Sequence, residues 1–313
     1  MRSAVTTGLF THEDCTRHDM GDWHPESPAR LAAIMDYLKA SGLLSELEEH
    51  EAVHVSREAL ARAHPERYLA ALDKLHPPEG LSWADPDTAL NIYTLDAAAR
   101  AAGGVVAAVK AVLSGKLANA FCAVRPPGHH AEYAQAMGFC FYNNVAVGVH
   151  EALASGLERI AVVDFDVHHG NGTVDIFKDE PRVLVCSSFQ HPFYPHRAHD
   201  VDRPNIVNTP LPEGTRGLQF RQRVEADWLK KLDAHAPQMV LVSAGFDGHA
   251  RDPLGGFELH EADYRWVTEL IADVAARHAG GRIVSVLEGG YDLDALARSV
   301  DAHVQVLREA DRL

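Results

Sequence analysis

Short apolar runs alternate with longer amphipathic segments over most of this chain. Five runs rich in β-branched residues predict buried strands, at about 120–124, 160–165, 183–186, 239–244 and 283–287. Apolar residues at helical spacing predict helices at about 144–155, 218–234, 259–279 and 293–310. This alternation of strand and helix is typical of an α/β domain with a mainly parallel central sheet and helices on both faces.

The pattern near the N-terminus is less regular. A strand is expected at about Ser3 to Leu9, followed by a polar loop from Thr11 to Glu26. Ser27 as the N-cap and Pro28 at the first helical position predict a helix that ends near Gly42.

Local signals predict two further helical regions and a long loop between the first helix and residue 120. Ser56 predicts a short helix, which residues 62–72 continue beyond a break at Pro65, and residues 76–91 predict a long loop. Thr94 is the expected N-cap of an Ala-rich helix through Leu113. Its Gly103-Gly104 pair indicates close packing against a neighbour.

Composition indicates an ordinary globular protein. The 313 residues contain 46% hydrophobic and 23% charged residues, and we expect a single domain over residues 1–313. No apolar run is long enough to span a bilayer and no secretory signal is evident, so a membrane partner is not expected. Four scattered cysteines without a Cys-x-x-Cys pair favour a cytoplasmic location. The net charge of −15 without a basic stripe disfavours nucleic-acid binding. A homo-oligomer is left open.

The 20 histidines are the unusual feature of the composition, and several lie near carboxylates. Asp164, Asp166 and His168 alternate at the end of the apolar run 160–165, so their side chains share one side. Two buried carboxylates need a compensating cation, metal or set of hydrogen bonds. The competing interpretation is that the aspartates only cap the following Gly-rich turn.

Three other predicted strands also end in polar motifs. These are Arg125 to Glu132 (Arg-Pro-Pro-Gly-His-His-Ala-Glu), Ser243 to Gly248 (Ser-Ala-Gly-Phe-Asp-Gly) and Leu287 to Asp292 (Leu-Glu-Gly-Gly-Tyr-Asp). In an open α/β sheet, ligands bind beyond the carboxyl ends of the strands. Asp166, His168 and Asp247 form a two-carboxylate, one-imidazole set that suits catalytic zinc. His129 and His130 suit proton transfer, and Tyr291 suits polarisation of a carbonyl. The competing interpretation of each motif, taken alone, is an ordinary surface turn.

Together with Gly138-Phe139-Cys140 and the run Asp164 to Thr173, these motifs resemble the zinc-dependent histone deacetylase superfamily, on the arginase-deacetylase fold. The likeness extends from about Phe10 to Leu307 in matching order. Asn171 stands where aspartate is often found, which resembles the class II and bacterial amidohydrolase or acetylpolyamine amidohydrolase branch.

The resemblance implies a role for each motif. It assigns Asp166, His168 and Asp247 to zinc, His130 to general base and acid catalysis, and His129 to electrostatic assistance. Tyr291 would hold the acyl oxygen. Asp164 would orient His129, and Asn171 would orient His130. Because Asn171 is neutral, we expect a lower pKa for His130 than an aspartate would give.

The resemblance also implies a potassium site and a substrate tunnel. Potassium would be bound by Asp164, Ser187 and Ser188, with carbonyl groups of the 164–168 segment. Gly138 and Phe139 would line the tunnel with Tyr194, although the run Phe193-Tyr-Pro-His-Arg departs from the usual family pattern.

The expected reaction is hydrolysis of an N-acyl amide, with an acyl-lysine peptide or protein as the first candidate substrate. The main alternative is an acetylpolyamine or another small acylated amine. Leu254 weakens that alternative because it stands where polyamine-selective relatives can carry a gatekeeping glutamate. A non-catalytic acyl-ligand binding protein and an arginase-like two-manganese enzyme are the less favoured alternatives.

Overall fold

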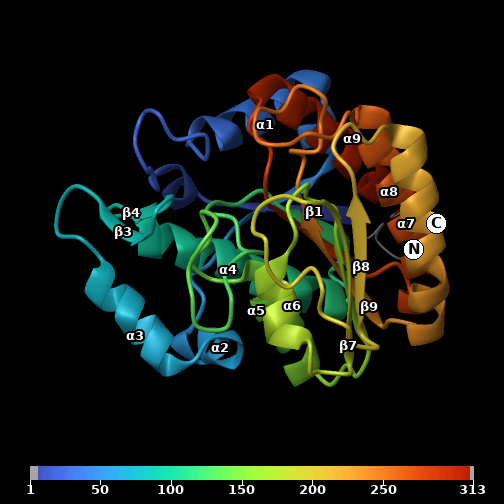
Figure 1. Ribbon diagram of the computed structural model, residues 1–313, viewed down its shortest axis with the longest axis horizontal. Coiled ribbons are helices and arrows are strands. Elements are labelled where there is room, and N and C mark those ends of the chain that lie inside the picture. The colour runs from blue at the N-terminus through green and yellow to red at the C-terminus, as the bar shows by residue number, and fades with distance from the viewer. Residues whose placement is uncertain (1–5, 311–313) are drawn as a thin grey trace.

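Eight parallel strands form the central sheet of the computed structural model, which describes residues 6–310 (Figure 1). Their order is β2-β1-β5-β10-β9-β6-β7-β8. The strands are β1 (Thr6–Thr11), β2 (Glu48–Glu51), β5 (Leu117–Cys122), β6 (Ile160–Asp164), β7 (Val183–Gln190), β8 (Ile206–Leu211), β9 (Met239–Ala244) and β10 (Ile283–Leu287). The prediction of a mainly parallel sheet in an α/β fold is confirmed.

Helices cover both faces of this sheet (Figure 1). On one face α4 packs against α5, and on the other α8 packs against α7 and α9, while α1 packs against α9. The helices are α1 (Ala29–Ser41), α2 (Arg57–Ala63), α3 (Glu66–Leu75), α4 (Thr94–Leu113), α5 (Asn144–Ala154), α6 (Asn171–Phe177), α7 (Gly217–His235), α8 (Glu261–Val274) and α9 (Leu293–Ala310). Within residues 6–310, no helix is long and apolar enough to cross a bilayer.

The structure corrects several predicted elements. The segment 76–91 is not loop throughout, because β3 (Ser82–Asp85) and β4 (Thr88–Leu90) form a two-stranded antiparallel sheet. β2 and β8 were not predicted: they are the edge strands, and their partly polar, partly exposed sequences lack the apolar run of a buried strand. The helix α6 was also missed, because its first residues, Asn-Gly-Thr, indicate a turn.

Two predicted helix caps are wrong by one position. The N-cap of α1 is Pro28 rather than Ser27, and the N-cap of α4 is Tyr93, so that Thr94 is the first helical residue. The first strand reaches Thr11, and its predicted beginning at Ser3 lies outside the described residues. Close packing at the glycine pair is confirmed, since a Cβ on Gly103 would lie 1.8 Å from the carbonyl oxygen of Val53.

The centre of the sheet determines where the chemistry is placed. Strands β5, β10, β9 and β6 are consecutive neighbours, and β6, β9 and β10 are buried along their whole length. Because parallel strands end at the same edge of a sheet, the four loops that follow these strands are neighbours. All four polar motifs singled out in the sequence lie at the ends of these strands and in the loops that follow.

Candidate active site

A buried group of two carboxylates and one imidazole lies at this edge of the sheet. Asp166 and His168 follow β6, and Asp247 follows β9. Ligand atoms of the three residues all lie within 4.8 Å of one another. His168 Nδ1 is 3.0 Å from Asp166 Oδ1 and 3.1 Å from Asp247 Oδ2.

The charges in this group are strongly coupled. Burial opposes a positive His168, but Asp247 and Asp166 raise its pKa to about 10. Burial, together with the neighbouring Asp166 carboxylate, raises the pKa of Asp247 to about 7. A proton on His168 thus stands between the two carboxylates, which is a place suited to a cation.

Two glycines make room for these carboxylates. A Cβ on Gly245 would lie 2.0 Å from Asp166 Oδ2, and a Cβ on Gly289 would lie 2.1 Å from Asp247 Oδ2. Since real Cβ atoms do not approach so closely, a side chain at either position would displace a carboxylate.

The two histidines that follow β5 have different partners. His129 Nδ1 is 2.9 Å from Asp164 Oδ2, and His130 Nδ1 is 2.7 Å from Asn171 Oδ1. Burial opposes the charge of His129, but Asp164 and the neighbouring acidic groups raise its pKa well above the ordinary value. Burial and the positive charges of His129 and His168 lower the pKa of His130. The pair therefore combines a charged and a neutral imidazole.

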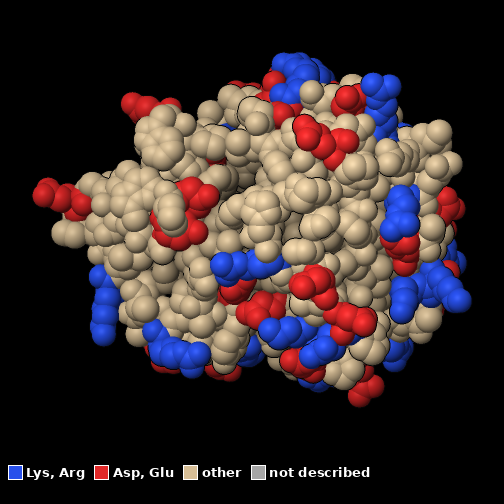
Figure 2. Space-filling model, viewed as in Figure 1, with Lys and Arg blue, Asp and Glu red and all other residues tan. Residues whose placement is uncertain are grey.

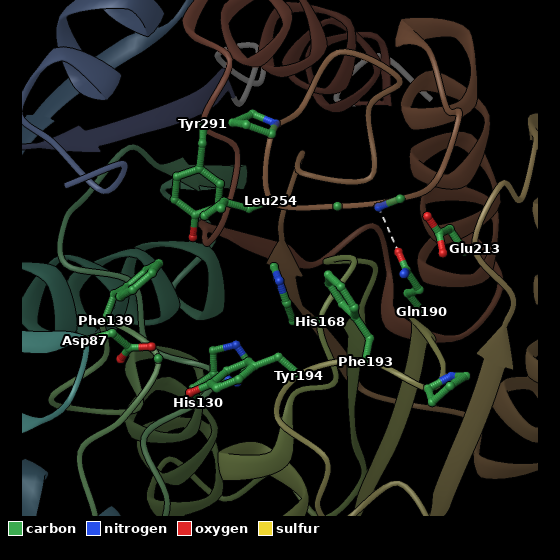
Figure 3. Close-up of a pocket in the computed structure, with 15 residues that line it drawn as sticks. Asp87, His130, Phe139, His168, Gln190, Phe193, Tyr194, Glu213, Leu254 and Tyr291 are labelled. Carbon is green, nitrogen blue, oxygen red and sulfur yellow. Dashed lines mark hydrogen bonds between the residues drawn. The ribbon is translucent and has the colours of Figure 1, made fainter. Parts of the chain in front are cut away.

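A cavity of about 490 Å³ opens beside these groups. Figure 3 shows His130, His168 and Tyr291 around it, with Phe139 and Tyr194 on its walls. Gly138, Phe193, Leu254 and Asp87 also line it. The structure thus places all four predicted substrate-binding residues, Gly138, Phe139, Tyr194 and Leu254, on one cavity.

The position of Tyr291 depends on a carboxylate that the sequence alone did not single out. Asp252 Oδ2 accepts hydrogen bonds from the backbone N–H of Tyr291 at 2.6 Å and of Asp292 at 3.3 Å, and Oδ1 accepts from Leu254 N–H at 2.9 Å. Burial raises the pKa of the Tyr291 phenol, which keeps it protonated and able to donate.

Glu288 is a second supporting carboxylate that the sequence reasoning missed. Its Oε2 accepts from the backbone N–H groups of Gly128 at 2.7 Å and His129 at 3.0 Å, and its Oε1 accepts from Ser243 Oγ at 3.0 Å. One side chain thus connects the loop after β10 with the loop after β5 and with strand β9. An acidic residue directly after the apolar run of β10 was the available signal.

A buried ionic network connects the loops that follow β5 and β10. Glu26 pairs with Arg30 at 3.1 Å and with Arg125 Nη2 at 2.7 Å, and all three side chains are fully buried. Arg30 also donates to the carbonyl oxygen of Gly290 at 2.6 Å, and its guanidinium carbon lies 4.9 Å from the centre of the Tyr291 ring. Apart from the Glu26–Arg30 pair, which is four residues apart, these contacts join residues far apart in sequence, so no local pattern indicated them.

The predicted potassium ligands lie next to Asp164. Ser187 on β7 is its partner in the β6–β7 register. The buried hydroxyls of Ser187 and Ser188 have no hydrogen-bond partner within residues 6–310, and neither does that of Tyr194.

A second group of potential metal ligands, His249, His260 and Glu261, lies outside the cavity. His249 Nδ1 accepts the backbone N–H of Arg251 at 3.1 Å, and the side chain of His260 accepts a backbone N–H as a helix cap. A neutral imidazole that accepts through one nitrogen carries its proton on the other. Both rings therefore have no lone pair left for a metal, and this group does not fit one.

The fold and the site together define an α/β enzyme with a carboxylate–histidine centre beneath a substrate cavity. Residues 24–307 match the histone deacetylase domain family. The chain therefore belongs to the histone deacetylase family of deacetylases and amidohydrolases.

Its relatives include proteins with several described roles. A probable deacetylase of Archaeoglobus fulgidus is 35% identical over 93% of this chain and 82% of its own length. A histone deacetylase-like amidohydrolase of Pseudomonas aeruginosa is 40% identical over 91% and 81%. The polyamine deacetylase HDAC10 of Mus musculus is 36% identical over 96% of this chain and 48% of its own.

The solved HDA15 HD domain has a similar fold. It superimposes with a TM-score of 0.93 at 33% identity, covering 98% of this chain and 89% of that domain. This likeness agrees with a single-domain α/β architecture.

Proposed function

We propose that this protein is a zinc-dependent amidohydrolase that removes acetyl or other acyl groups from the ε-amine of lysine side chains. The observation that carries the proposal is the convergence of Asp166, His168 and Asp247 with His130 and Tyr291 around one cavity. Family membership supports the reaction class, and these residues supply the groups that amide hydrolysis needs.

The donor set fits zinc. Catalytic zinc sites typically have three protein ligands and leave a position open to water and substrate, and two carboxylates and one imidazole supply three ligands of accepted kinds. The raised pKa of His168 supports this assignment, because the cluster already attracts a positive charge. When bound, zinc would supply a Lewis acid that polarises the amide carbonyl and lowers the pKa of water.

The chain's own side chains would carry the proton transfers. Neutral His130 accepts a proton from the attacking water through Nε2 and later donates it to the leaving amine. The Tyr291 hydroxyl donates a hydrogen bond to the acyl oxygen as negative charge develops there. His129, held by Asp164 at 2.9 Å, contributes positive charge beside the reacting atoms.

We also propose that potassium binds near Asp164. The argument is the buried, unpartnered hydroxyl of Ser187, which lies directly across the sheet from Asp164. Ser188 is the next residue of β7, so its hydroxyl points to the opposite face and it would contribute its backbone carbonyl oxygen instead. Oxygen ligands of this kind suit a hard monovalent cation, which would offset the buried Asp164 carboxylate.

An acyl-lysine is the substrate that the cavity walls favour. Phe139 and Tyr194 offer aromatic surface for an aliphatic stem, and Leu254 adds an apolar side chain rather than a charge. The competing proposal, an acylated polyamine, has one specific observation in its favour. Asp87 lines the cavity beside Asp85, and neither forms an ion pair with a Lys, Arg or His within residues 6–310.

The remaining expectations concern partners and location. In Figure 2, acidic and basic side chains are interspersed around a mostly uncharged central area, which offers no basic stripe for a nucleic acid on that face. We propose one deacetylase domain over residues 1–313. Four buried, free thiols are compatible with a cytoplasmic location, which stays a prediction, as does a homo-oligomer.

The test compares turnover of an acetyl-lysine peptide with that of acetylputrescine, with zinc quantified by elemental analysis. We expect one zinc per chain and faster hydrolysis of the peptide. His130→Ala and Tyr291→Phe should each lose most of the turnover while retaining zinc. Full activity in either variant would contradict the assigned roles, and faster hydrolysis of acetylputrescine would favour the competing substrate.

A further inference from the structure

The hydrogen bond between His130 and Asn171 continues outward to a carboxylate. Asn171 Nδ2 donates to Glu132 Oε1 at 2.7 Å, while Asn171 Oδ1 lies 2.7 Å from His130 Nδ1. Glu132 in turn accepts from Arg197 Nη1, which is 3.3 Å from both carboxylate oxygens. Asn171 is fully buried, so both ends of its amide depend on these protein partners.

A carboxylate can orient the amide because it only accepts hydrogen bonds. The amino end of Asn171 must face Glu132, and its carbonyl end is then directed at His130. A carbonyl oxygen also only accepts, so the proton of the neutral His130 ring resides on Nδ1. The Nε2 lone pair is left free to accept a proton from water.

The reversed amide would have the opposite effect. With Asn171 turned over, its amino group would face His130 Nδ1 and force that nitrogen to accept. The proton would then reside on Nε2, which could no longer act as a base.

We propose that Glu132 is a positioning residue: it orients the amide of Asn171 and thereby holds His130 in the tautomer that can accept a proton. This inference rests on the proposed amidohydrolase function for its catalytic consequence. The tautomer itself is a property of the protein that can be measured without substrate.

Other acceptors near Asn171 Nδ2 are weaker or longer. The carbonyl oxygen of His130 is 3.4 Å away and the sulfur of Met137 is 3.3 Å away. Neither matches a charged oxygen at 2.7 Å. Loss of Glu132 should therefore weaken the orientation of the amide without abolishing it.

Arg197 gives a role to the loop that departs from the family pattern. It lies between His196 and Ala198, which both have a φ of +60°, in the left-handed region that L-residues seldom adopt. This turn brings the guanidinium to Glu132. Because Arg197 is about half exposed, with 46% of its side chain accessible, its contribution should be small.

Turnover of four variants tests the proposal. Glu132→Ala removes the acceptor, and kcat should fall about tenfold with little change in KM, the equivalent of one hydrogen bond. Glu132→Gln should lose less, because its amide can still present an oxygen to Asn171. Asn171→Asp should lower kcat when Glu132 is present, since two carboxylates would face each other at about the distance of the present hydrogen bond.

The double variant separates positioning from a general structural role. In a Glu132→Ala background, Asn171→Asp should raise kcat, because a carboxylate presents an acceptor to His130 whichever way it turns. Asn171→Asp thus changes from harmful to beneficial when Glu132 is removed. An Asn171→Asp change that lowers kcat in both backgrounds would overturn the proposal.

Nitrogen-15 NMR of the histidine rings in the metal-free protein gives a readout besides activity. The His130 signal is assigned by its loss in His130→Ala. We expect the proton on Nδ1 in the native protein and a mixture of Nδ1–H and Nε2–H in Glu132→Ala. An unchanged tautomer would refute the proposal, whereas a native protein with the expected tautomer but no amidohydrolase activity would refute only the proposed function.

Glu180→Gln is a matched control. Glu180 also pairs with an arginine, Arg182, at 2.6 Å, but it lies after α6 and away from the cavity. Its kcat and the His130 tautomer should equal those of the native protein, with melting temperatures of all variants measured alongside.

Discussion

Replacing Asp252 by asparagine should reduce catalysis without removing the catalytic residues themselves. The carboxylate accepts three backbone N–H groups, from Leu254 at 2.9 Å, Tyr291 at 2.6 Å and Asp292 at 3.3 Å. An asparagine amide has only one accepting end. At least one N–H group must then face an NH₂ group, whichever way the amide turns.

The size of the effect follows from these hydrogen bonds. A hydrogen bond to a charged group contributes about 1.5–3 kcal/mol, so Asp252→Asn should destabilise the local loop by roughly that amount. Tyr291 would move relative to the reacting carbonyl, and a displacement of about 1 Å can cost up to about a hundredfold in rate. We expect kcat to fall ten- to a hundredfold, because the phenol acts mainly in the transition state.

Steady-state kinetics with an acetyl-lysine peptide, together with zinc content and a denaturant melt, measures each part of this expectation. Asp294→Asn is the control, because Asp294 is exposed and its ion-pair partners among residues 6–310 are Arg251 and Arg298 at the surface. Its kcat should stay within about twofold of the native value. If Asp252→Asn is folded, retains zinc and turns over at the native rate, the argument that Asp252 positions Tyr291 is refuted.

Three further predictions concern the metal site and the packing beside it. Gly289→Ala should weaken zinc binding about ten- to a hundredfold in a chelator competition, because its Cβ would lie 2.1 Å from Asp247 Oδ2; unchanged affinity would contradict the crowding argument. Zinc affinity should fall about tenfold per pH unit below pH 10, where His168 holds a proton that zinc must displace. The fall should steepen below about pH 7, where Asp247 also becomes protonated, and a flat profile by calorimetry would refute both assignments. Gly103→Ala should lower the free energy of unfolding by about 1–3 kcal/mol in a urea titration, because its Cβ would lie 1.8 Å from Val53 O. Zinc affinity should not change. A variant as stable as the native protein would contradict this prediction and would show that the helix can shift.

The central strands and their loops could be predicted because both have local signals. A fully buried parallel strand needs a continuous apolar run, and the polar residues that follow it stand out by contrast. Asp166, His168, Asp247 and Tyr291 were singled out as candidates in this way. The edge strands β2 and β8 lack that contrast, because exposed positions tolerate polar residues.

The supporting contacts could not be predicted from sequence. Glu288 and Asp252 accept hydrogen bonds from backbone N–H groups. Every residue except proline carries such a group, so the residue type does not reveal which one is the donor. Glu26 and Arg125 are 99 residues apart, so their pairing depends on the completed fold. Glu132 belongs to the Arg125–Glu132 motif. Its hydrogen bond with Asn171 depends on where the start of α6 places Asn171 in the fold, and the sequence did not predict α6.

The proposed function requires that the Asp166, His168 and Asp247 cluster binds one zinc ion and that hydrolysis depends on this ion. The most direct measurement is a titration of zinc into metal-free protein while hydrolysis of an acetyl-lysine peptide is followed. The rate should rise linearly to one equivalent per chain and then level off, and Asp247→Asn should remove most of this rise. Metal-free protein that hydrolyses the peptide at the full rate would contradict the account.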